Sequence, residues 1–144
     1  MSSAMTGTGT VLRSGSPGRH PHTVLIVDDE PSITRALAIA CKRAGYDVLA
    51  TTSGEQAQSY LATQVVDAMI VDLRMPDLRG DVLFHLATAR QPHLKRQTLF
   101  TTGDVSPRAQ ELIAACGCPF LRKPFELSDV LQTLRALLPL AQTA

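Results

Sequence analysis

Apolar residues along this chain fall into two kinds of stretch, which alternate from about residue 22 onward. Short runs rich in apolar and β-branched residues predict β-strands. Five such runs occur, at residues 23–27, 46–50, 65–71, 97–101 and 119–121. The first, TVLIV, is apolar at four of its five positions, which indicates a strand that is buried on both faces.

Between these runs, apolar side chains recur every three or four residues, which predicts amphipathic helices. Ser53 and Ser106 are expected to cap the amino ends of two of them. Gly45 and Gly117 are expected to end two of them, because glycine readily adopts the left-handed backbone found there. The predicted helices span residues 31–44, 54–63, 81–89, 107–116 and 126–138.

Strand and helix alternate five times, which predicts an α/β fold with a doubly wound, five-stranded parallel sheet between two helix layers. We expect this domain to cover residues 22–141. Residues 1–21 are rich in Ser, Gly, Thr and Pro, so we expect a flexible tail that does not contribute to the fold. The chain ends within a few residues of the fifth predicted helix, so no output domain is expected.

The composition of the chain argues against several functions. Its 144 residues carry 14 Lys and Arg against 13 Asp and Glu, whereas nucleic-acid binders usually have a large basic excess. No apolar run approaches the ~18 residues of a membrane span, and the N-terminus lacks the apolar segment of a secretory signal. Three cysteines do not make a disulfide framework. We therefore expect a cytoplasmic protein that binds neither membrane nor nucleic acid directly.

Chemically active side chains stand where the predicted strands end. The first strand leads to a carboxylate pair, the third to one carboxylate, the fourth to two hydroxyls and the fifth to an ammonium group: Asp28 and Asp29, Asp72, Thr101 and Thr102, and Lys123. Ligands of open parallel sheets bind outside the carboxyl ends of the strands, because these ends share one edge. The sequence thus predicts a single site that combines three carboxylates, a hydroxyl and an ammonium group.

Three clustered carboxylates repel one another unless positive charge offsets them. Lys123 supplies one such charge, and a divalent ion would supply the rest. Only oxygen ligands are available, which favours Mg²⁺, with Mn²⁺ as an alternative. Cys116 and Cys118 lack the further ligands that a zinc site needs and are interpreted as packing residues.

This set of side chains suits phosphoryl transfer, which needs a nucleophile, a metal and fixed donors for the developing charge. A carboxylate can act as the nucleophile and form an acyl phosphate. Asp72 stands alone after the third strand, whereas Asp28 and Asp29 form a pair suited to holding metal. Asp72 is therefore the preferred candidate for the nucleophile.

Four motifs follow one another at these strand ends: Asp28-Asp29, Asp72 with MPDLRG behind it, Thr102-Gly103 and Lys123-Pro124-Phe125. Together they resemble the receiver domain of two-component response regulators. The resemblance covers roughly residues 22–141. It implies a (βα)5 flavodoxin-like receiver fold with strand order 2-1-3-4-5, here of the stand-alone, single-domain type.

The resemblance also implies how the acidic residues divide their roles. Asp72 matches the phosphoacceptor of the family. Asp28 and Asp29 match its acidic metal-binding pair, with Asp72 as a further metal ligand. The backbone carbonyl of Arg74 matches one more metal ligand, while the Arg74 side chain could be a solvated surface charge.

Three further residues match groups that respond to the phosphoryl group in this family. The hydroxyl of Thr102 and the ammonium group of Lys123 would bind it. Thr101 also carries a hydroxyl, but the small residue that follows Thr102 favours Thr102. Phe120 matches the aromatic residue that moves with this hydroxyl, and this role is preferred over that of a plain core residue. The Lys123–Pro124 peptide bond is expected to be cis.

The implied function is that of a signalling receiver, not of a conventional enzyme. It would take a phosphoryl group from a sensor histidine kinase or a histidine phosphotransfer protein and signal to an unknown downstream protein. It would catalyse only its own phosphorylation and its slow dephosphorylation, as a monomer or weak dimer.

Two other functions fit the same fold class. A flavodoxin-like carrier would need a hydroxyl- and glycine-rich loop for the FMN phosphate, where this chain has Asp28, Asp29 and Glu30, which would repel it. A hydrolase with an aspartyl-phosphate intermediate would need a second acid two residues after the nucleophile, where this chain has Arg74.

Overall fold

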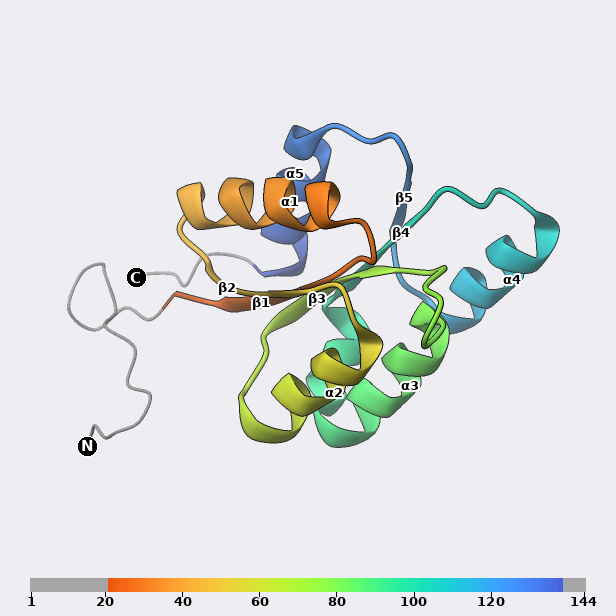
Figure 1. Cartoon of the computed structure of the whole chain (residues 1–144), viewed down its shortest axis with the longest axis horizontal. Coiled ribbons are helices and arrows are strands. Elements are labelled where there is room, and N and C mark those ends of the chain that lie inside the picture. Colours follow the sequence, from red (N-terminus) through yellow and green to blue (C-terminus); the bar gives the residue numbers. More distant parts are fainter. Residues whose placement is uncertain (1–20, 139–144) are drawn as a thin grey trace.

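A single parallel sheet forms the centre of the protein, whose computed structural model describes residues 21–138. The sheet has five strands in the order β2-β1-β3-β4-β5, which confirms the predicted topology (Figure 1). The strands are β1 (Thr23–Val27), β2 (Asp47–Thr51), β3 (Ala68–Asp72), β4 (Thr98–Thr102) and β5 (Phe120–Arg122).

Helices cover both faces of the sheet, as Figure 1 shows. One face carries α1 (Pro31–Arg43) and α5 (Leu127–Leu137). The other carries α2 (Gly54–Thr63), α3 (Gly80–Arg90) and α4 (Pro107–Cys116). The three inner strands, β1, β3 and β4, are therefore buried at almost every position, because successive side chains enter opposite layers.

Neighbouring positions of β3 illustrate this two-sided burial. Met69 packs in the layer of α2, α3 and α4, while Ile70 packs in the layer of α1 and α5. Both side chains are at most 1% exposed. At about 25 cal/mol per Å² of buried apolar surface, this double core supplies the main favourable term in folding.

The predicted bounds of α2 and α4 are confirmed, with their capping interactions, whereas those of α1, α3 and α5 are each wrong by one residue at one or both ends. The Ser53 side chain accepts a hydrogen bond from the Gln56 amide (3.1 Å), and that of Ser106 accepts one from the Ala109 amide (3.2 Å). Gly117 ends α4 with a φ of 72°, in the left-handed region. The positions of α2 and α4 are thus determined by local sequence.

Several predicted strand boundaries were wrong by one to three residues. The predicted second strand began at residue 46, but the Tyr46 amide bonds to the Cys41 carbonyl and so closes the end of α1. The predicted third strand began at residue 65, but Val65 is 71% exposed and the Val66 amide bonds to the Gln91 side chain. A short 3-10 helix, Pro92–Arg96, was not predicted.

Both ends of the described chain, Pro21 and Leu138, lie at the edge where the strands begin, because α5 runs antiparallel to the strands (Figure 1). The predicted tail, residues 1–21, lies outside the described residues except for residue 21, and so do residues 139–141 of the predicted domain. Among residues 21–138, no helix is both long enough and apolar enough to cross a membrane.

Candidate functional site

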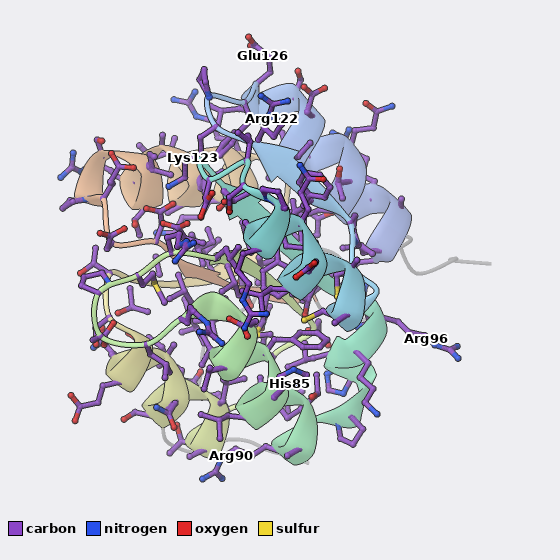
Figure 2. All side chains as sticks on the ribbon, turned by 90° about the vertical axis from the view of Figure 1, so that its right-hand side faces the viewer. His85, Arg90, Arg96, Arg122, Lys123 and Glu126 are labelled. Carbon is purple, nitrogen blue, oxygen red and sulfur yellow. The ribbon has the colours of Figure 1, made fainter. Side chains whose placement is uncertain are left out.

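Lys123 joins two of the predicted acidic residues at the carboxyl edge of the sheet. Its Nζ lies 2.9 Å from Asp28 Oδ2 and 3.1 Å from Asp72 Oδ2. Glu30 adds a more exposed carboxylate, 3.3 Å from the same nitrogen. Figure 2 looks onto this edge and shows Lys123 in the loop after β5, on the side of α1. The predicted convergence of strands β1, β3 and β5 is therefore observed.

Asp72 is a buried carboxylate at the end of the central strand, only 3% exposed. Its Oδ1 accepts a hydrogen bond from the Arg74 amide (3.2 Å) and its Oδ2 faces Lys123. Burial, and then the neighbouring charge of Asp28, raise the pKa of Asp72 from 3.8 to about 6, although Lys123 acts in the opposite direction. Asp72 is thus still mostly ionised near neutral pH, but its charge is poorly solvated and remains available for chemistry.

Lys123 remains protonated at neutral pH. Burial lowers its pKa, but the ion pairs with Asp28 and Asp72 outweigh this effect and raise the pKa above its ordinary value. The Lys123 amide also bonds to the Thr102 carbonyl (2.8 Å), which anchors the loop after β5 to β4. The Lys123–Pro124 peptide bond is cis, as predicted.

Asp28, Asp29 and Asp72 form the one cluster of potential metal ligands found among residues 21–138. One carboxylate oxygen of each residue lies within 4.8 Å of the others. Asp28 and Asp72 are buried, and Asp29 is more exposed. This set of oxygen donors, with the raised pKa of Asp72, fits a hard divalent cation such as Mg²⁺. The Arg74 amide bond to Asp72 places its backbone beside the cluster, while its carbonyl remains a predicted ligand.

The Thr102 hydroxyl is engaged within its own loop and not with Asp72. Thr102 Oγ1 donates to the Asp104 carbonyl (3.2 Å) and accepts from the Asp104 amide (2.9 Å). Phe120, its predicted partner on β5, is 43% exposed, so it is not a core residue in this conformation. The structure therefore brings Asp28, Asp29, Asp72 and Lys123 together, but leaves Thr102 and Phe120 outside this cluster.

Sequence reasoning missed two side chains that hold the loop after β3. Arg74 is half exposed but paired: its Nε donates to Asp104 Oδ2 (2.7 Å). Asp77 Oδ2 accepts from the amides of Gly54 (3.0 Å) and Glu55 (3.3 Å) and so caps the start of α2. Each of these contacts joins residues more than 20 positions apart, so no local pattern could have indicated them.

Gly80 is expected to be intolerant of any side chain. A Cβ there would collide with the Asp72 carbonyl oxygen, at the end of the central strand, and lie 2.9 Å from Leu73 Cα, directly after it. Gly80→Ala should therefore lower the free energy of unfolding by about 1–3 kcal/mol, as overpacking does elsewhere. Gly103→Ala is the matched control, since its Cβ would meet nothing within 4 Å. Urea denaturation of both variants tests this; equal stability would contradict it.

A protein-family model and several curated relatives match most of this chain. The family model that matches is that of the response regulator receiver domain, over residues 24–135. The transcriptional regulatory protein KdpE of Mycobacterium tuberculosis is 38% identical over 117 residues, which are 78% of this chain and 49% of KdpE. TcrX of the same organism, a probable transcriptional regulatory protein, is 31% identical over 82% of this chain and 50% of its own length. This chain thus spans about half the length of these relatives.

Solved structures match the whole described fold. The chemotaxis protein CheY4 of Vibrio cholerae is 29% identical and superimposes with a TM-score of 0.73. The match covers 82% of this chain and 99% of CheY4. The five-stranded architecture described above therefore also occurs in known proteins.

Proposed function

Because the chain belongs to the response regulator receiver family, a signalling family of two-component systems, we propose that Asp72 accepts a phosphoryl group from a phosphohistidine. The donor would be a sensor histidine kinase or a histidine phosphotransfer protein. The observation that carries this proposal is the ionised, buried carboxylate of Asp72 beside Lys123 and the acidic pair. A downstream protein would then distinguish the phosphorylated form from the free one.

In the proposed reaction, an oxygen of the Asp72 carboxylate attacks the phosphorus atom of the phosphohistidine. An O–P bond forms, the N–P bond breaks, and the departing imidazole takes a proton from solvent. Lys123, already 3.1 Å from Asp72, would pair with the transferred phosphoryl oxygens. Asp28, Asp29, Asp72 and the Arg74 carbonyl would hold Mg²⁺, which supplies charge neutralisation in the transition state.

Incubation with acetyl phosphate and Mg²⁺ tests this proposal directly. The protein should gain the mass of one phosphoryl group, in a form that base removes, as expected of an acyl phosphate. No mass gain would contradict the proposal. Continuous turnover of small phosphate esters would instead favour the hydrolase, and a bound yellow chromophore would favour the flavodoxin-like carrier.

The second part of the proposal concerns the response to phosphorylation. A phosphoryl group on Asp72 offers new acceptors to the Thr102 hydroxyl, which must leave Asp104 to reach them. Its departure vacates space beside β4, and Phe120 on the neighbouring strand is the side chain that can fill it. We expect a population shift between two packings of the α4, β5 and α5 surface.

Amide chemical shifts with and without beryllofluoride and Mg²⁺ test this switch. Shifts beyond the site should cluster in residues 102–135, and Thr102→Ala should reduce them without abolishing binding. Thr101→Val is the matched control: its hydroxyl is buried, with no hydrogen-bond partner among the described residues. Shifts that stay at the ligand, or that depend on Thr101 instead, would contradict the proposed switch.

A further inference from the structure

Arg74 and Asp104 link the two loops between which a phosphoryl group on Asp72 would sit. Arg74 lies in the loop after β3, and Asp104 in the loop after β4. Besides the Nε bond of 2.7 Å, Arg74 Nη2 also contacts Asp104 Oδ2, so the guanidinium binds the carboxylate through two nitrogens. This ion pair is a direct side-chain connection between the loop after β3 and the loop after β4.

Asp104 is at the same time the residue that holds the Thr102 hydroxyl. Its backbone amide and carbonyl both bond to Thr102 Oγ1. Its other carboxylate oxygen, Oδ1, accepts a hydrogen bond from the Ser106 amide (2.8 Å), directly before α4. The bond from Ser106, and then that from Arg74, hold the pKa of Asp104 below its usual range, so this carboxylate is charged at neutral pH.

We propose that the Arg74–Asp104 ion pair is a latch that holds the Thr102 hydroxyl away from Asp72 in the unphosphorylated protein. This inference rests on the proposed function, since it concerns the switch of the same site. Arg74 and Asp104 are positioning residues: they act through Thr102. Breaking the pair releases the loop after β4. This lowers the free-energy difference between the two packings, which the phosphoryl group must overcome to shift the population.

The expected effect is modest, because the pair is partly solvated. The Arg74 and Asp104 side chains are 52% and 22% exposed. Ion pairs at such positions typically change equilibria by about two- to fivefold. The latch thus adjusts the population of the two packings and does not decide it alone.

The test measures the affinity for beryllofluoride with Mg²⁺ in Arg74→Met, Asp104→Asn and the double variant. Met keeps the aliphatic length and the Arg74 carbonyl, and Asn keeps an oxygen for the Ser106 amide. The latch predicts that each single variant binds about two- to fivefold more tightly. It also predicts that the double variant binds no more tightly than either, because the same contact is broken.

A direct effect of charge on the anion gives a different result. Loss of the Arg74 cation would then weaken binding, while loss of the Asp104 anion would strengthen it. Changes of opposite sign in the two single variants would therefore overturn the latch. Arg108→Met is the matched control. In the part of the chain that the structure describes, the one ion pair of Arg108 is with Glu111, one turn further along α4 (4.0 Å), and both side chains are exposed. This variant should bind beryllofluoride with unchanged affinity.

A second readout needs no ligand. In the free single variants, the amide resonance of Gly103 should already lie part of the way toward its position in the beryllofluoride complex of the wild type. Unmoved resonances would overturn the latch even if affinities change. Failure of the wild type to bind beryllofluoride would overturn the proposed function as well. If the wild type binds it but the two single variants change the affinity in opposite directions, the latch alone is overturned.

Discussion

Asp72→Asn is expected to take up no phosphoryl group from acetyl phosphate and yet to be more stable than the wild type at neutral pH in EDTA. The loss of labelling follows because the amide is not a nucleophile and Asp72 is the proposed acceptor. The gain in stability follows because a buried carboxylate beside Asp28 is unfavourable when ionised, as its raised pKa shows.

The pH dependence of this gain has a definite sign. The pKa of Asp72 is about 6 in the folded protein against 3.8 ordinarily, so the stabilising contribution of its proton is fully present below 3.8 and is lost as pH rises through 6. That shift corresponds to about 3 kcal/mol at ~1.4 kcal/mol per unit. The opposing effect of Lys123 is already contained in this raised pKa, so we expect Asp72→Asn to gain about 2–3 kcal/mol at neutral pH.

Urea denaturation in EDTA at neutral pH and near pH 4 measures this difference. The advantage of Asp72→Asn should be present at neutral pH and largely vanish in acid, where the wild-type carboxyl is protonated. A variant that is less stable at neutral pH would show that the ion pair with Lys123 outweighs the unfavourable burial. Labelling at the wild-type rate would remove Asp72 from the proposed reaction altogether.

Removal of the divalent metal is the second change from which we expect a large effect. EDTA should stop labelling, because the oxygens of Asp28, Asp29 and Asp72 lie within 4.8 Å of one another and need a cation between them to bind a further anion. Asp29→Ala should weaken Mg²⁺ binding at least tenfold, or about 1.4 kcal/mol. Calorimetry or NMR can measure this affinity, since the chain has no Trp whose fluorescence could report it.

Glu30→Gln is the matched control for Asp29→Ala. Glu30 is the next acidic residue along the chain and contacts Lys123, but it does not belong to the cluster of metal ligands. Its replacement should change Mg²⁺ affinity little. Labelling that persists in EDTA, or an equal loss of affinity in both variants, would contradict the proposed division of roles.

The acidic cluster could be predicted from sequence because strand ends fix where side chains meet. Asp28, Asp72 and Lys123 each stand at or next to the carboxyl end of a strand, and all parallel strands end at the same edge. The topology thus brings them together without any knowledge of loop conformation. The fold was predictable for a related reason, because buried parallel strands have a distinctive apolar pattern.

The contacts of Arg74 and Asp77 could not be predicted in this way. Both lie in the loop after β3, and their partners lie 30 and 23 residues away in other loops or at another helix end. Sequence shows the charge of such residues but not the direction of their side chains. The start of β3 was misjudged for a similar reason: Val65 has high strand propensity, but solvent and not a neighbouring strand surrounds it.

The antiparallel course of α5 has a practical consequence for work with this protein. Residues 21 and 138 both lie at the edge where the strands begin, and Asp72 lies at the other end of a five-residue strand. At about 3.3 Å per residue, roughly 17 Å of sheet separates the two edges. A fluorophore or surface tether beside His22 or Leu138 should therefore leave the carboxyl edge open to a docking kinase. By the same geometry, a group attached there can sense phosphorylation only through movement relayed across the layers of the fold.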